Sequence, residues 1–191
     1  MKKSFGPRTL VLPVPVWAVG TYDREGRPNV VTVAWGGLCC SIPPCITVSL
    51  RKATLSYANI MERKAFSVNV PSAGYFREVD YFGLVSGREQ DKLCHAGLTP
   101  VRCRNVDAPY IDEFPLVLEC RLLQTVEIGL HTAFIGEILD VMADEDVIGE
   151  RGFPEIEKVK PILYTPELHD YYGTGEFLGS AFQAGREIRP K

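Results

Sequence analysis

The chain has 191 residues, of which 46% are hydrophobic and 24% charged, with a formal net charge of -3. This length and apolar content predict a single domain, residues 1–191, with a sizeable core. The absence of an overall basic field argues against nucleic acid as a partner, and the absence of a long apolar run argues against a membrane span.

The N-terminal segment MKKSFGPRTLVLPVPVWAV has two lysines before an apolar run, as a signal peptide does. Pro13 and Pro15 would interrupt the helix that such a peptide needs, so we expect a cytoplasmic protein. The six cysteines, at positions 39, 40, 45, 94, 103 and 120, are then expected to be reduced.

The stretch PVWAVGTYDREGRPNVVTVAWGG, residues 15–37, predicts a β-hairpin, because two runs rich in Val, Trp and Thr flank the turn formers of DREGRP. Side chains alternate along a strand. The second strand therefore has a bulky face (Val31, Val33, Trp35) and a modest one (Val30, Thr32, Ala34).

The segment AWGGLCCSIPPC, residues 34–45, places two adjacent cysteines between a glycine pair and a proline pair. These flanks make a regular strand improbable and predict an irregular turn that lets Cys39 and Cys40 face one pocket. A metal site, a redox dithiol and plain packing stay open for the two thiols. A disulfide between these neighbours would need a small strained ring, so free thiols are favoured.

The segment SLRKATLS, residues 49–56, joins a predicted strand (CITVSL, 45–50) to a predicted helix (TLSYANIMERK, 54–64) with Thr54 as N-cap. Arg51 and Lys52 precede the helix, and its free amide groups and the Thr54 and Ser56 hydroxyls are expected to point toward the same spot. This indicates a phosphate site. The alternative is a solvated basic turn with an ordinary cap.

The rest of the chain adds strands and one further helix. Strands are predicted at AFSVNV (65–70), PLVLECRLLQTVEIG (115–129), HTAFIGEILDVMA (131–143), KPILYT (160–165) and LHDYYG (168–173), and a helix within YFREVDYFGLVSG (75–87). Many hairpin-linked strands with few helices predict an antiparallel all-β sandwich or barrel. The Gly-rich tail, residues 173–191, is expected either to wrap a surface or partner subunit or to be loosely held.

Taken together, NVVTVAWGGLCCSIPPCITVSLRKATLSYANI, FSVNV and GLVSGREQDKL resemble the flavin reductase-like family of FMN-binding split barrels, most closely its flavoredoxins and related ferric reductases. The resemblance spans residues 13–164. It implies an all-β, Greek-key split β-barrel with a few short helices, forming a homodimer with FMN near the subunit interface.

The resemblance also implies a set of FMN-binding residues. The isoalloxazine ring is expected beside Asn29, Thr32, Val33, Ala34 and Trp35, and its edge or the ribityl chain beside Cys39, Cys40 and Ser41. The phosphate is expected at Ser49, Arg51, Lys52, Thr54 and Ser56. Lys92, with Ser86, is expected near the pyrimidine end, His131 at a flavin carbonyl or the phosphate, and Tyr164 over the ring or in the subunit interface.

The function implied is transfer of electrons through FMN, either as a carrier between redox proteins or as a ferric or flavin reductase that uses NAD(P)H. The sequence has no recognisable nicotinamide-binding fingerprint, which favours the carrier. One alternative is a metal-binding or redox-sensing protein that uses the Cys39 and Cys40 thiols as metal ligands. Another is a structural barrel in which Arg51, Lys52 and Lys92 are solvated surface charges.

Overall fold

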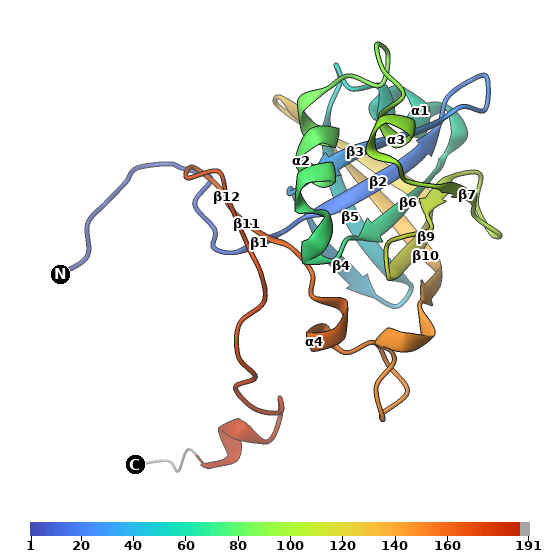
Figure 1. The fold of residues 1–191 in the computed structure, drawn as a ribbon. Coiled ribbons are helices and arrows are strands. Elements are labelled where there is room, and N and C mark those ends of the chain that lie inside the picture. The colour runs from blue at the N-terminus through green and yellow to red at the C-terminus, as the bar shows by residue number, and fades with distance from the viewer. Residues whose placement is uncertain (188–191) are drawn as a thin grey trace.

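The computed structural model describes residues 1–187, and its main element is a seven-stranded antiparallel sheet (Figure 1). Its strands run in the spatial order β3-β2-β6-β9-β10-β5-β4. Their bounds are β2 Trp17–Tyr22, β3 Pro28–Val33, β4 Gly36–Ser41, β5 Pro44–Arg51, β6 Ala65–Val70, β9 Leu116–Ile128 and β10 His131–Ala143. The predicted hairpin (β2 and β3) and the long pair around Gly129 (β9 and β10) are confirmed.

Smaller elements surround this sheet. β1 (Val14–Pro15), β11 (Leu163–Thr165) and β12 (Asp170–Tyr172) form a three-stranded sheet, and β7 (Pro100–Arg102) pairs with β8 (Pro109–Ile111). The α-helices are α1 Leu55–Arg63, α2 Phe76–Leu84, α3 Lys92–Ala96 and α4 Ile156–Val159, with 3-10 turns at Ala73–Tyr75, Glu145–Val147 and Ala184–Glu187. The short α3, α4, β7 and β8 were not predicted. Among the described residues, no helix is long and apolar enough to cross a membrane.

Helix α1 begins where its sequence predicts. The Thr54 hydroxyl accepts a hydrogen bond from the Tyr57 amide, which satisfies one of the free N–H groups of the first turn. The helix ends at Lys64, whose left-handed backbone lets its amide donate to the Ile60 carbonyl. The strand-to-helix join at β5 and α1 is therefore held by local hydrogen bonds.

Side chains of β3 alternate between its two faces, as predicted, and each face packs into a different core. Val33 is buried in the barrel interior beside the fully buried Phe134, and Val31 packs against the same cluster. Val30 points the other way, into a second cluster beneath helix α2, where it meets Val79. This alternation leaves the end of β3 between the two cores, where it borders a cavity.

The prediction of an irregular turn at the cysteine pair is wrong. Gly36–Ser41 is strand β4, paired with β5, and one register shift between Leu38 and Cys40 makes a bulge at Cys39. Gly36 allows the close approach of another side chain, because a Cβ at this position would stand 2.5 Å from Trp17 Cζ3. Pro44 is tolerated because it is the first residue of β5.

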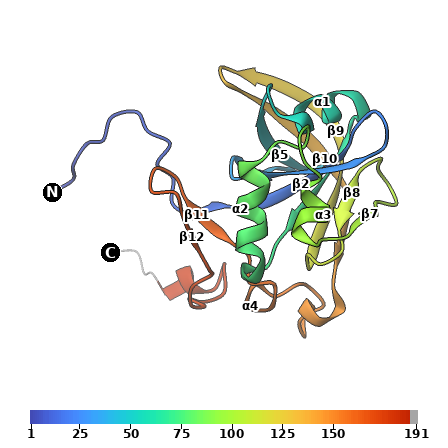
Figure 2. The same cartoon turned by 45° about the horizontal axis from the view of Figure 1, so that its top comes forward.

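Both terminal segments extend away from the main sheet (Figure 1, Figure 2). They carry exposed apolar side chains, including Val11 near the start and Phe177, Leu178 and Phe182 near the end. The predicted tail from 173 onward leaves the body of the protein after β12. Its last four residues, 188–191, lie outside the described residues.

Candidate functional site

A cavity of about 390 Å³ opens where the ends of β3, β5 and β10 meet α2 and the β11–β12 pair. It is lined by eight predicted site residues: Thr32, Val33, Ala34, Trp35, Ser49, Arg51, His131 and Tyr164. The prediction missed three further lining residues: Val16, Gly83 and Tyr171. Tyr171 lies directly opposite Tyr164 in the β11–β12 pair, so pairing the two predicted strands would have identified it.

The polar end of this cavity suits an anion. Arg51 and His131 lie opposite each other in the β5–β10 pair, and within residues 1–187 no carboxylate lies within ion-pair distance of Arg51. None of the described residues that line the cavity is Asp or Glu. Burial and the neighbouring guanidinium of Arg51 lower the pKa of His131, so its ring is largely neutral at pH 7. Arg51 therefore supplies the fixed positive charge.

The remaining walls of the smaller cavity are formed by aromatic rings and by small residues. The rings of Tyr164 and Tyr171 lie 5.4 Å apart, and the Tyr171 hydroxyl donates a hydrogen bond of 2.9 Å to Asp80 Oδ1. Burial, and then this bond, raise the pKa of Tyr171 well above its usual value. A Cβ on Gly83 would come within 3.7 Å of Thr32, whose hydroxyl donates to the Val79 carbonyl. Aromatic side walls and small residues such as Gly83 make room for a planar ring.

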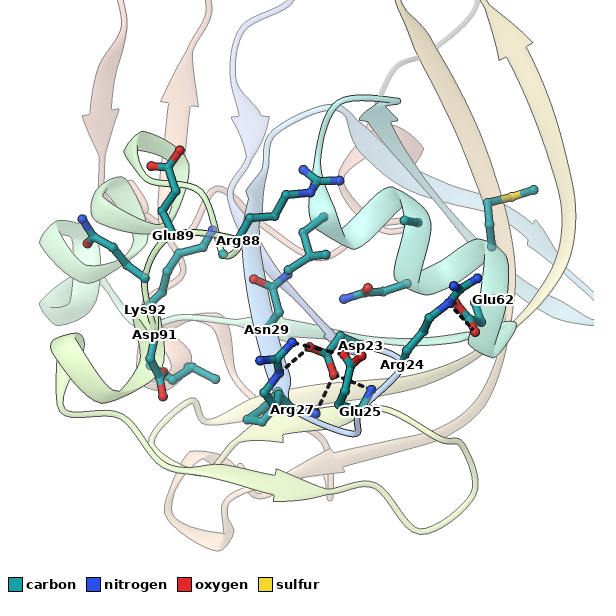
Figure 3. Close-up of a pocket in the computed structure, with 18 residues that line it drawn as sticks. Asp23, Arg24, Glu25, Arg27, Asn29, Glu62, Arg88, Glu89, Asp91 and Lys92 are labelled. Carbon is teal, nitrogen blue, oxygen red and sulfur yellow. Dashed lines mark hydrogen bonds and ion pairs between the residues drawn. The ribbon is translucent and has the colours of Figure 1, made fainter.

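A larger cleft of about 1020 Å³ lies between the β2–β3 turn, α1 and residues 87–93 (Figure 3). Many of its charges are already paired: Asp23 with Arg27 at 2.7 Å, and Arg24 with Glu62 at 2.7 Å. Because these charges already have partners, the larger cleft has fewer charged side chains free to bind a ligand.

Two predicted site residues, Asn29 and Lys92, line the larger cleft and not the smaller cavity. Lys92 is only 5% exposed, and its Nζ donates a hydrogen bond of 2.8 Å to the Phe82 carbonyl near the end of α2. Burial lowers the pKa of Lys92 from 10.5 to about 8. Gly83, next to Phe82, lines the smaller cavity, so Lys92 reaches the helix end that borders it.

Asn29 is held by a strap, residues 86–88, that crosses between α2 and α1. The Asn29 Nδ2 donates to Ser56 Oγ at 2.8 Å, and both side chains are buried. A Cβ on Gly87 would overlap Asn29 Oδ1, so the strap passes in direct contact with the Asn29 amide. Arg88 Nη1 holds the strap to the turn before α1 by donating to the Ala53 carbonyl at 2.6 Å. Ser86 accepts a bond of 3.3 Å from the Arg88 amide within the same loop.

The structure does not gather the predicted phosphate residues at one point. Arg51 reaches the cavity, but Lys52 is exposed and its Nζ lies 2.8 Å from Glu127 Oε1. The Thr54 hydroxyl is used in the helix cap, where it also donates to the Arg51 carbonyl. Ser56 is buried against Asn29. Roles for these three at a phosphate stay predictions.

The predicted residues Cys39, Cys40 and Ser41 lie on β4, exposed, and line neither cavity. Their placement at a ring edge stays a prediction. In the part of the chain that is described, no group of three or more His, Cys, Asp or Glu side chains is arranged to hold a metal ion. A metal site at Cys39 and Cys40 thus gains no third ligand from such residues.

Comparisons with known proteins place this chain among flavin-dependent proteins. The family model described as "Flavin reductase like domain" matches residues 9–167. The structure of flavoredoxin of Desulfovibrio vulgaris (Miyazaki F) is 52% identical, with a TM-score of 0.93, over 97% of this chain and 100% of that one. Flavoredoxin from Methanosarcina acetivorans is 30% identical, with a TM-score of 0.90, over 98% and 99%.

Other matches support the split-barrel fold and show how much of the curated relatives this chain spans. A putative flavin reductase with a split barrel domain from Shewanella frigidimarina is 20% identical, with a TM-score of 0.81, over 90% of this chain and 87% of that one. Among curated relatives, uncharacterized proteins of Archaeoglobus fulgidus and Aeropyrum pernix are 35% and 30% identical over 60% and 82% of this chain. The chain spans 65% and 59% of their lengths, less than two thirds of either.

Proposed function

The chain belongs to the flavin reductase like family and has its split-barrel fold, and from this we propose that it binds FMN and transfers electrons as a flavoredoxin does. The similarity to flavoredoxin covers nearly all of both chains, which supports a shared function for the whole domain. Once bound, FMN supplies the redox chemistry by accepting a hydride or single electrons.

The observation that carries this proposal is the composition of the smaller cavity. Arg51 is a cation without an ion-pair partner among residues 1–187, and the neutral His131 lies opposite it. The walls are aromatic, and none of the described lining residues is a carboxylate. The Arg51 guanidinium and the His131 ring suit a phosphate ester, because a guanidinium and an N–H group donate strong hydrogen bonds to its oxygens. A planar ring needs the flat walls. FMN has both parts, so the residues present fit it.

The roles follow from position in the cavity. Arg51 and His131 would hold the phosphate, with Ser49 beside them on β5. Thr32 and Ala34 would let the ring lie close to β3, and Trp35 and Tyr164 would enclose it. Lys92, near the end of α2, would favour negative charge on the reduced ring, which raises its reduction potential. Asn29, held by Ser56 and the strap, lines the neighbouring larger cleft, so its expected place beside the ring stays a prediction.

We further propose a homodimer whose terminal segments pack on the partner. Leu178 is 97% exposed and Val11 is 69% exposed on segments that project from the body (Figure 1). Exposed apolar side chains on such extensions are unfavourable in water unless another surface covers them. Tyr164 lies in β11, shortly before the C-terminal segment, and would then be near both the cavity and the interface.

Carrier and reductase are distinguished by the electron donor. We propose the carrier, with a redox protein as partner, because the sequence has no nicotinamide-binding fingerprint. Anaerobic mixing of the FMN-loaded protein with NADH or NADPH is expected to bleach the flavin slowly. Fast bleaching, followed by reduction of ferric citrate, would instead identify a flavin or ferric reductase.

The cavity assignment is tested by FMN titration of the Arg51→Gln variant. A charged hydrogen-bond donor is worth about 1.5–3 kcal/mol, so the dissociation constant for FMN is expected to rise roughly 10- to 100-fold. Arg151→Gln, which removes an equal charge from an exposed loop, is the matched control and is expected to bind FMN as the wild type does. Wild-type protein that fails to bind added FMN would overturn the proposed function itself.

A further inference from the structure

The hairpin of β4 and β5 places two cysteines opposite each other. Cys40 on β4 and Cys45 on β5 are directly paired in the antiparallel register, and both are free thiols. β4 is the edge strand of the seven-stranded sheet (Figure 1). Cys40 is exposed, and Cys45 is only 3% exposed. One thiol is therefore open to solvent while its partner is shielded behind it, and neither lines the FMN cavity proposed above.

The spacing of opposed residues suits a disulfide. Residues directly opposite in an antiparallel pair have Cα atoms about 4.5–5.5 Å apart and side chains on the same face of the sheet. A disulfide needs a Cα separation of about 4.4–6.8 Å. In opposed strand residues the Cβ atoms are typically about 4.5–5.5 Å apart, slightly more than the roughly 3.5–4.5 Å of a relaxed disulfide. Closing a bond between Cys40 and Cys45 would therefore draw the two strands together. Such a bond is strained and easily reduced.

We propose that Cys40 and Cys45 form a reversible disulfide across the β4–β5 hairpin, through exchange with the disulfide of a small thiol such as oxidised glutathione. The exposed Cys40 thiolate attacks one sulfur of that disulfide, and the first small thiolate leaves. Cys45 then loses its proton and attacks Cys40 Sγ, and the second small thiolate leaves. The two protein thiols are oxidised by two electrons, the small disulfide is reduced, and the two protons pass to the two thiolates released.

The environment of the two thiols sets this order of attack. Burial, and then the proximity of Cys40, Cys39 and Glu137, raise the pKa of Cys45. The Cys40 thiol itself donates to the Ile42 carbonyl at 3.3 Å. Cys45 is thus both shielded and mostly protonated at neutral pH, which suits the second step better than the first. Cys40, exposed on the edge strand, is the entry point.

Cys39 is the main competitor, and the register argues against it. It occupies the bulge between Leu38 and Cys40, so it has no partner opposite it on β5. A bond from Cys39 to Cys40 would close a small strained ring. The pairing therefore favours Cys45 as the partner of Cys40.

The test equilibrates FMN-loaded, fully reduced protein with mixtures of oxidised and reduced glutathione, blocks free thiols by alkylation and maps the products by mass spectrometry. In the wild type and the Cys39→Ser variant, positions 40 and 45 are both expected to escape alkylation and to be joined by an internal bond, whereas the other exposed cysteines can form only glutathione adducts. Adding excess reduced glutathione is expected to restore both. The Cys45→Ser variant is expected to stop at a glutathione adduct on Cys40.

Two results would overturn the proposal. One is a Cys39→Ser protein that keeps both remaining hairpin thiols alkylatable at every glutathione ratio, and the other is an internal bond that requires Cys39. If Cys45→Ser fails to fold, Cys40→Ser at the exposed position provides the same test, since it too must abolish the internal bond. The readout is independent of flavin absorbance, so failure here leaves the proposed FMN function standing, and loss of FMN binding leaves this result readable.

Discussion

Replacing Lys92 by Met is expected to stabilise the protein at pH 7. The fold buries this amine and lowers its pKa from 10.5 to about 8. At about 1.4 kcal/mol per pH unit, this difference corresponds to a cost of about 3 kcal/mol for holding the charged form in the folded state. Met removes that cost but loses the hydrogen bond to the Phe82 carbonyl, worth about 1 kcal/mol. The free energy of unfolding of Lys92→Met should therefore exceed that of the wild type by about 2 kcal/mol.

The stability difference between Lys92→Met and the wild type should decrease as the pH rises. Below about pH 8 both the folded and the unfolded wild type carry a protonated Lys92, so the whole cost is present. Between about pH 8 and 10.5 the folded form binds fewer protons than the unfolded form, so wild-type stability rises with pH relative to the variant. The advantage of the variant should shrink by roughly 2–3 kcal/mol between pH 7 and pH 10.

Urea unfolding of both proteins at the two pH values, at the same FMN loading, measures this difference directly. Subtracting the wild type from the variant cancels the other titrating groups. Lys3→Met, at an exposed position near the N-terminus, should show no such pH dependence. A stability difference for Lys92→Met that is equal at pH 7 and pH 10 would refute the reasoning, because it would mean that the amine keeps its ordinary pKa.

Three further substitutions test other parts of the structure. Gly136→Ala would place a Cβ 2.5 Å from Phe66 Cζ and should cost about 1–3 kcal/mol in urea unfolding, whereas a neutral result would show that the Phe66 ring moves freely. Thr54→Ala should cost about 0.5–2 kcal/mol by thermal or urea unfolding, and unchanged stability would contradict its role as the cap of α1. Gly87→Ala should displace Asn29 and weaken FMN binding about tenfold by titration; unaltered affinity would separate the strap from the proposed site.

Several features could be predicted from the sequence because they are local. The turn formers of DREGRP between two β-rich runs determine the β2–β3 hairpin, and Thr54 caps α1 through a bond to a residue three positions away. The alternation of Val30 and Val31 follows from strand geometry alone. The family resemblance, carried by the order of short motifs, then indicated Arg51, His131 and the end of β3.

The cysteine segment shows where local rules fail. Glycine and proline flanks predicted a turn, but Gly36 is needed so that Trp17 can pack against the backbone of an edge strand. The same pairing that makes β4 a strand sets Cys40 opposite Cys45. Register between strands depends on which faces are buried, and that is a property of the whole sheet.

The sequence by itself determined the β2–β3 hairpin, the long β9–β10 pair and the cap of α1, since these depend on residues near one another in the chain. Only the tertiary structure decided which of the predicted site residues lie around the same cavity. It brought Arg51 beside His131 from a distant strand, and it turned the adjacent Lys52 toward Glu127. Arg51 is the last residue of β5 and Lys52 lies in the turn that follows, so whether each side chain meets a cavity or solvent depends on the strands and helices packed around this join.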